Sequence, residues 1–99
     1  MTVIWILEDH PEIGPLLVSV LRGPEGLRVS LFDSGEAALA AAEADGAPDI
    51  VYYHHLSGQP TGPEVIEALR RRNPAFRAHQ VFGTLPLEHL RYRATRLSM

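Results

Sequence analysis

Acidic side chains and histidines occupy the positions where two apolar segments of the sequence end. Glu8 and Asp9 follow the run TVIWIL, and His54 and His55 follow the run IVYY. Carboxylates hold divalent cations or pair with basic groups, whereas an imidazole ligates metals, moves protons or pairs with a carboxylate. The chemistry therefore depends on whether the fold brings these two groups together.

Composition restricts the class of protein. The chain has 99 residues, 45% of them hydrophobic, which suits one small globular domain over residues 1–99. It contains no cysteine, so disulfides and thiolate chemistry are excluded. Because the sequence shows neither a run long enough to cross a bilayer nor a basic leader, we expect a soluble cytoplasmic protein with no membrane partner.

Charge is divided unevenly along the chain. Residues 1–50 carry nine acids and two arginines, whereas residues 51–99 carry seven arginines and three glutamates. All nine strongly basic residues are arginines, and there is no lysine. The arginines that could meet a nucleic acid are Arg70, Arg71, Arg72, Arg91, Arg93 and Arg96. The net charge of −3 and the lack of a DNA-binding motif argue against that function, which stays an alternative.

The hydrophobic pattern predicts alternating strands and helices. Apolar or alternating runs predict strands over Thr2–Leu7, Leu27–Phe32, Asp49–Tyr53 and Gln80–Gly83. Helical periodicity and helix-start signals predict helices over Pro11–Arg22, Glu36–Ala44, Pro63–Arg72 and Leu87–Leu97, with Asp33 or Ser34 as the N-cap of the second. Such alternation predicts βαβ units, and hence a parallel sheet with helices on both faces.

In a parallel sheet of this kind, the carboxyl ends of the strands form the working edge. The residues at those ends include Glu8, Asp9 and His10 after the first strand, and His54 and His55 after the third. We therefore expect His54 to lie near the two acids.

The sequence resembles the receiver domain, the phospho-accepting module of bacterial two-component response regulators. The stretch VIWILEDHPEI resembles the first strand and acidic pair of that family, and VSLFDSGEAALAAAEADGAPDIV resembles its second strand, its second helix and the approach to its third strand. The spacing also agrees: Glu8 and Asp9 precede His54 by 46 and 45 residues, Gly62 follows it by eight and Thr84 by thirty.

The resemblance implies an α/β fold with three αβα layers and a parallel sheet of receiver type, in the order 2-1-3-4. The chain ends fifteen residues after Thr84, so the resemblance also implies a truncated domain that lacks the fifth strand and fifth helix of the family.

Two departures from the family pattern bear on function. The phospho-acceptor of receivers is an aspartate, and here that position holds His54. The lysine of the family would fall beyond the last residue, and the chain has no lysine. Receiver chemistry combines the aspartate, Mg²⁺ on the acidic pair and the lysine, so ordinary aspartyl phosphorylation is excluded at this site. Thr84 keeps the place of the switch hydroxyl and Gly62 that of the loop glycine. We expect no catalytic residue and no enzyme.

Three roles remain open for His54. It can pair with Glu8 and Asp9, whose charges favour the cationic imidazole, and so replace Mg²⁺ without any cofactor. It can bind a divalent transition metal such as zinc or nickel together with Glu8 and Asp9, with His10 or His55 as a further ligand. It can itself be phosphorylated. We favour the first role, that of a phosphorylation-independent pseudo-receiver.

A truncated receiver would leave part of its surface uncovered. The fourth strand would be an open edge, and soluble proteins seldom leave such edges and apolar faces bare. The last helix could fold over the gap, or two chains could cover each other by edge pairing or by exchange of that helix. We therefore expect a protein–protein interaction module of two-component-type signalling, whose partner is a second copy or another signalling protein.

Overall fold

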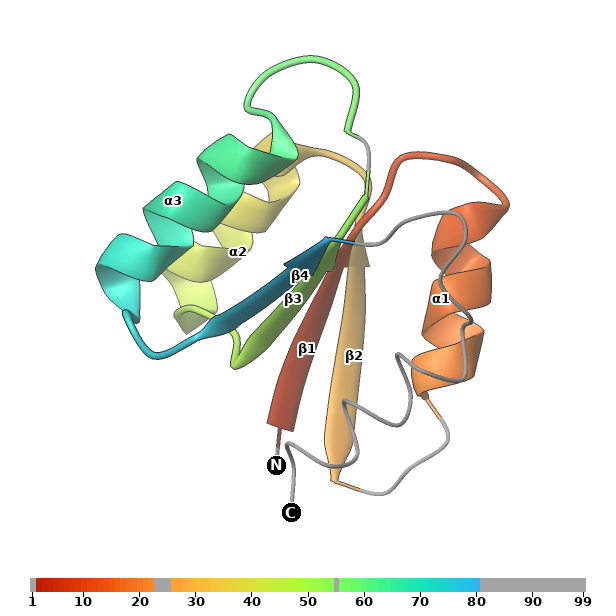
Figure 1. Cartoon of the computed structure of the whole chain (residues 1–99), viewed down its shortest axis with the longest axis horizontal. Helices are drawn as coiled ribbons and strands as arrows, with labels where there is room; N and C mark the ends of the chain where they lie inside the picture. The colour runs from red at the N-terminus through yellow and green to blue at the C-terminus, as the bar shows by residue number, and fades with distance from the viewer. Residues whose placement is uncertain (1, 23–25, 55, 81–99) are drawn as a thin grey trace.

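A computed structural model describes residues 2–22, 26–54 and 56–80 of the chain. Strands and helices alternate through them, as Figure 1 shows: β1 Thr2–Leu7, α1 Ile13–Leu21, β2 Leu27–Phe32, α2 Gly35–Asp45, β3 Ile50–Tyr53, α3 Gly62–Arg72 and β4 Arg77–Gln80. The helix predicted over Leu87–Leu97, Thr84, and any fifth strand or helix lie outside the described residues. No described helix is both long enough and apolar enough to span a membrane.

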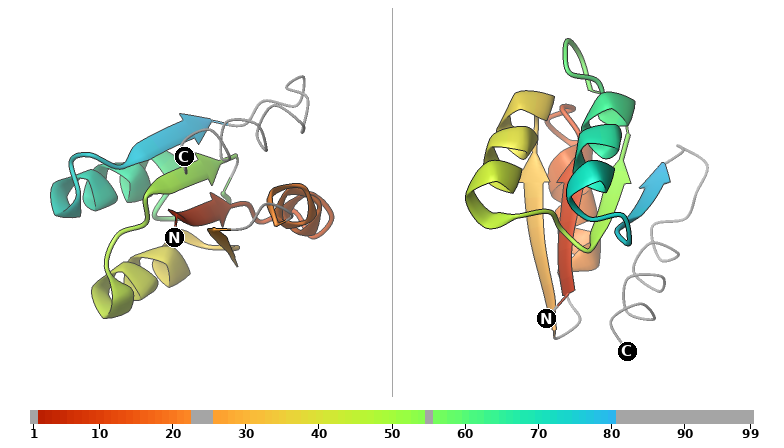
Figure 2. Two further views of the ribbon diagram at one scale, coloured as in Figure 1. Left: turned by 90° about the horizontal axis from the view of Figure 1, so that it is seen from below. Right: turned by 90° about the vertical axis from the view of Figure 1, so that its left-hand side faces the viewer.

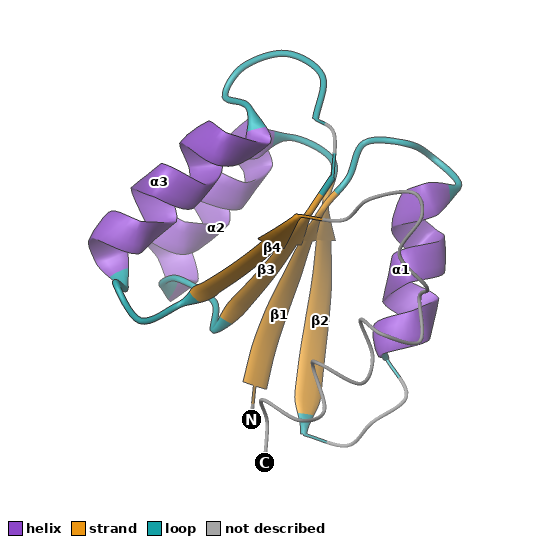
Figure 3. Ribbon diagram, viewed as in Figure 1, coloured by secondary structure: helices purple, strands orange, loops and turns teal. Residues whose placement is uncertain are grey.

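The four strands form one parallel sheet in the order β2-β1-β3-β4 (Figure 3). This confirms the order predicted from the sequence. The last residue of β1, Leu7, pairs with Phe32 at the end of β2 and with Tyr53 at the end of β3. Because these three strands end level with one another, the residues that follow them meet at a single edge of the sheet.

Helices cover both faces of the sheet, which confirms the three-layer arrangement (Figure 2). On one face, α1 packs against alternate strand residues in a cluster formed by Ile4, Ile6, Leu17, Leu21, Ile50 and Tyr52. On the other face, α2 and α3 pack against Trp5, Leu7 and Val51 through Ala38, Ala42, Val65 and Leu69. The central strands are therefore buried on both sides, as continuous apolar runs predict.

Local sequence signals explain the helix boundaries. The hydroxyl of Ser34 accepts a hydrogen bond of 3.1 Å from the amide of Ala37, and Gly46 ends α2 with φ of 87°. Both features match the predicted start and stop of that helix. In α1, Pro15 lies in the first turn, where its missing N–H removes no intrahelical hydrogen bond.

The position of the fourth strand differs from the prediction. The sequence pattern predicted it over Gln80–Gly83, whereas β4 spans Arg77–Gln80 and the residues from 81 onward are not described. The segment RAHQ is polar, and it becomes a strand because it pairs residue by residue with β3, from Ile50 with Arg77 to Tyr53 with Gln80. Tertiary pairing outweighs local strand propensity here.

Candidate functional site

Glu8 and His54 meet at the carboxyl edge of the sheet. The amide of His54 donates a hydrogen bond of 3.1 Å to the carbonyl of Leu7, which extends the pairing of β3 with β1 by one residue. This places the imidazole next to the residue that follows β1. Nδ1 of His54 lies 2.5 Å from Oε2 of Glu8, a short hydrogen bond or ion pair. The structure thus brings together the two groups that the sequence placed at neighbouring strand ends.

The Glu8 carboxyl group is buried, whereas the imidazole reaches the surface. The Glu8 side chain is 1% exposed and the His54 side chain 33% exposed. The second oxygen, Oε1, accepts a hydrogen bond of 2.9 Å from the amide of His10. A buried carboxylate is costly unless its oxygens have donors, and both oxygens of Glu8 have one. The contact joins Nδ1 of His54 to a carboxyl oxygen of Glu8, so the two groups share one proton.

Asp9 has a different role from Glu8. Its Oδ2 accepts a hydrogen bond of 2.6 Å from the amide of Ser57, in the segment that joins β3 to α3. The contact ties the segment after β1 to the segment after β3. Ser57 was not among the residues selected from the sequence, because it contributes its backbone amide and no side-chain pattern marks that donor.

The start of α3 is fixed beside His54 by a capping box. The amide of Glu64 donates to the hydroxyl of Thr61, and the Glu64 carboxylate accepts from the amide of Thr61 at 3.0 Å. The motif TGPE carries this signature of a helix start. Gly62, expected as a loop residue, is instead the first residue of α3, one position before the predicted start. A Cβ atom there would lie 3.2 Å from the Tyr53 ring, so glycine lets the helix approach β3.

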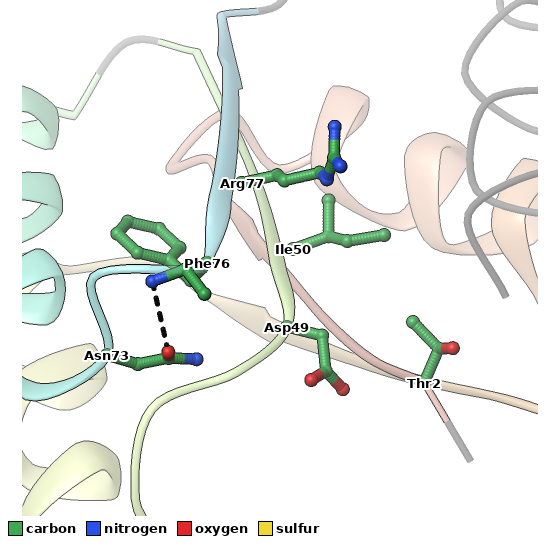
Figure 4. Close-up of a pocket in the computed structure, with 7 residues that line it drawn as sticks. Thr2, Asp49, Ile50, Asn73, Phe76 and Arg77 are labelled. Carbon is green, nitrogen blue, oxygen red and sulfur yellow. Dashed lines mark hydrogen bonds between the residues drawn. The ribbon is translucent and has the colours of Figure 1, made fainter.

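A hollow of about 360 Å³ lies beside His54 at this edge, lined by Tyr53, His54, Leu56, Thr61, Gly62, Pro63 and Gln80. Another, of about 340 Å³, lies at the opposite end, where the strands begin (Figure 4). Two of the residues that line this second hollow have polar groups that form hydrogen bonds within the fold. Asp49 accepts a hydrogen bond of 2.8 Å from the amide of Val3, and the carbonyl of Asn73 accepts one of 3.1 Å from Phe76.

The candidate metal ligands do not form a cluster in the described part of the chain. Within it, no three His, Asp or Glu side chains gather in a way that could hold a metal ion. Glu8 and His54 contact each other, Asp9 accepts from Ser57, and the His10 side chain is exposed. His55 lies outside the described residues.

The arginines at the end of α3 contact the fold itself. Arg70 lies over the ring of Phe76, with its guanidinium carbon 5.0 Å from the ring centre. Arg72 donates a hydrogen bond of 3.5 Å to the carbonyl of Ala42 and lies 3.9 Å from the carboxylate of Glu43. Two of the three arginines of this segment therefore have partners on α2 or in the α3–β4 turn, and the late arginines from Arg91 onward are not described.

No protein-family model and no curated protein matches the sequence. Among solved structures, the chain is similar to the BeF3-activated receiver domain of DrrB, with a TM-score of 0.80 and 18% identity over 97% of this chain and 96% of that one. It is also similar to a LuxR-family DNA-binding response regulator from Silicibacter pomeroyi, with a TM-score of 0.64 and 24% identity over 99% of this chain and 72% of that one. The chain therefore has the fold of a response regulator receiver domain.

Proposed function

We propose that this chain is a pseudo-receiver, a phosphorylation-independent module for protein–protein interaction in bacterial two-component-type signalling. The receiver fold supports the signalling class. One observation carries the rest of the proposal: His54, at the position of the phospho-acceptor, is hydrogen-bonded to the buried carboxylate of Glu8.

Phosphoryl transfer to a receiver needs an attacking carboxylate, a divalent cation and positive charge around the transferred oxygens. Here the acceptor is an imidazole whose Nδ1 is engaged by Glu8, and the second acid accepts a hydrogen bond from Ser57. The acidic pair is thus occupied by groups of the protein itself. A site filled in this way holds one arrangement without a phosphorylation signal, so the output of the module resides in the proteins that it binds.

The partner in this proposal is a second copy of the chain or another signalling protein, in the cytoplasm. The module needs no cofactor and performs no reaction. Its specificity would come from surface residues rather than from Glu8 or His54.

Incubation with acetyl phosphate and Mg²⁺, followed by intact-mass measurement, tests phosphorylation independence. We expect the mass of the full chain to stay unchanged, while a receiver domain with an acceptor aspartate, treated in parallel, gains a phosphoryl group. A labile adduct of one phosphoryl group on this chain would contradict the proposal. If that adduct were absent from His54→Ala, His54 itself would be the acceptor.

Calorimetric titration with Zn²⁺, Ni²⁺ and Mg²⁺ separates the proposal from a metal-dependent switch at Glu8, Asp9 and His54. We expect no binding isotherm for any of the three ions. Zinc or nickel binding that His54→Ala abolishes, and that His10→Ala retains, would replace the pseudo-receiver with the metal switch.

A further inference from the structure

We propose that β2 is a self-association edge, at which two copies of the chain pair their β2 strands antiparallel about a two-fold axis and so continue one sheet across the dimer. The inference rests on the interaction role proposed above, because it names the surface and the partner. It involves no residue of the Glu8–His54 pair.

β2 is a long edge strand. It has six residues, as many as the central β1, and among the described residues it pairs only with β1. Figures 1 and 2 show it at the margin of the sheet, on the side away from β4. An unpaired edge of this length presents a row of amides and carbonyls to another strand.

The direction of the backbone groups is fixed by the pairing with β1. The carbonyl of Gly26 accepts from Thr2 at 2.7 Å, and the carbonyl of Phe32 accepts from Glu8 at 3.1 Å. Backbone groups alternate in direction along a strand, so the amides and carbonyls of Leu27, Val29 and Leu31 point away from β1. These are the groups that a further strand would use.

Hollows flank this edge on both faces of the sheet. On the α1 face, a hollow of about 490 Å³ is lined by Pro15, Val18, Ser19, Arg22, Val29 and Leu31. On the α2 face, a hollow of about 340 Å³ is lined in part by Trp5, Arg28, Ser30, Phe32, Ala41 and Asp45. The side chains of an added strand alternate between the faces, so they would enter both hollows. Leu31, 37% exposed, would gain cover.

The side-chain pattern of β2 is complementary to itself. Leu27, Val29 and Leu31 face α1, whereas Arg28, Ser30 and Phe32 face α2. In an antiparallel pair, residues directly opposite each other lie on the same face, and a two-fold axis therefore sets apolar against apolar. A register centred on Ser30 places Val29 opposite Leu31 of the second copy. It also places Arg28 opposite the Phe32 ring, a favourable cation–π arrangement.

Charge selects the antiparallel direction. Arg28 stands at the start of β2 and Asp33 directly after its end; both side chains are exposed, and neither forms an ion pair within the described residues. Antiparallel pairing brings the Arg28 end of each copy near the Asp33 end of the other, twice per dimer, although Arg28 lies directly opposite Phe32 and not opposite Asp33. Parallel pairing would set like charges side by side. The occupant that fits this edge is therefore a second copy of the chain.

Sedimentation equilibrium of the full chain, with charge variants, tests the pairing. We expect a dimer for the natural sequence, and a dissociation constant raised about tenfold by Arg28→Asp, since the change removes two Arg28–Phe32 contacts per dimer. Arg71→Asp, a change of the same kind at an exposed position of α3, is the control and should associate as the natural chain does. A monomer at micromolar concentration, or an Arg28→Asp variant that associates as the natural chain does, would overturn the proposal.

Crosslinking gives a second test, because the chain contains no cysteine. In the register centred on Ser30, the two Ser30 Cα atoms form a non-hydrogen-bonded pair about 4.5 Å apart, within the range that a disulfide spans. We expect Ser30→Cys to give a covalent dimer on oxidation, and Ala68→Cys, half-buried on α3, to stay monomeric. Equal crosslinking of the two variants would overturn the pairing. Neither experiment changes the outcome of the phosphodonor test, so the two proposals fail separately.

Discussion

Glu8 depends on its neighbours more than any other described charged residue, because it is the only one of them that is buried. One oxygen accepts from the backbone of its own loop, at the His10 amide, and the other meets His54 from the far side of the sheet edge. The first partner is local and unaffected by side-chain changes. The second can be removed by a single substitution, so His54 controls whether the buried acid is satisfied.

His54→Ala should lower the free energy of unfolding by about 2 kcal/mol, because it leaves one oxygen of buried Glu8 without a donor. Urea denaturation at neutral pH measures the loss. His10→Ala is the matched control: its side chain is exposed and its contact to Glu8 is made by the backbone. Equal losses for the two variants would mean that the Glu8–His54 contact contributes nothing to stability.

His54→Asp restores the acceptor residue of the receiver pattern and sets a second carboxylate beside Glu8. We expect it to be less stable at neutral pH than the uncharged match His54→Asn, because like charges repel. Mg²⁺ should raise the melting temperature of the aspartate variant, since a bound cation stabilises the folded state, and leave the natural chain unchanged. An equal rise in the natural chain would show that its acidic pair still takes the ion.

The start of α3, beside the site, contains an ionisable group, the Glu64 carboxyl. Hydrogen bonds from the Thr61 backbone, and then from the Thr61 hydroxyl, hold the pKa of Glu64 below its usual value. The folded state therefore favours the ionised carboxylate. Stability from this contact is present above the ordinary carboxyl pKa of about 4.3 and is lost as the pH falls through the lowered pKa.

Glu64→Gln should consequently be less stable than the natural chain at neutral pH, and the difference should shrink on acidification towards the lowered pKa. Thermal unfolding across the acidic range measures it. Glu67→Gln, exposed on the same helix, serves as the control and should show no such convergence. A difference for Glu64→Gln that is constant with pH would contradict the role of the charge in the capping box.

Two glycines begin helices on the same face of the sheet, but they differ in the space around them. A Cβ at Gly35 would clash with the carbonyl oxygen of Pro60, whereas one at Gly62 would lie 3.2 Å from a ring carbon of Tyr53. Helix propensity alone predicts that alanine stabilises both positions. We expect Gly35→Ala to destabilise by about 2 kcal/mol through overpacking against backbone, and Gly62→Ala to have a smaller effect. Denaturant unfolding measures the change in the free energy of unfolding for both variants. A Gly35→Ala variant more stable than the natural chain would contradict the close approach of Gly35 to the Pro60 carbonyl.

Structure could be predicted from the sequence where a local residue pattern determines it. It could not be predicted where strand pairing or a backbone hydrogen bond determines it. β1 and β2 have the predicted bounds because each is marked by a run of apolar or alternating residues. β4 was predicted too late, since its polar segment is a strand only through its pairing with β3. The approach of His54 to Glu8 followed from the parallel sheet, whereas the bond from Ser57 to Asp9 uses an amide that no side-chain pattern reveals.

The molecule as a whole separates its two candidate surfaces. The Glu8–His54 pair lies at the carboxyl edge of β1 and β3, near the centre of the sheet, whereas β2 forms its margin. The Glu8 amide donates to the Phe32 carbonyl of β2, but His54 and Arg28 lie beside strands that do not pair with each other, and the effects of such separated substitutions usually add. Under the two proposals, a receiver fold loses its acceptor chemistry and still presents an edge for association.

The state of the Glu8–His54 site can be observed in an amide NMR spectrum of the full chain, recorded before and after addition of Mg²⁺ and BeF3, the ligand with which the DrrB receiver domain was activated. The proposed function implies that the imidazole of His54 leaves no place for the ion or the anion. We expect the amides of Asp9, Ser57 and Gly62 to keep their chemical shifts. Saturable shifts centred on those three amides would show that the site still binds both, and would contradict the pseudo-receiver.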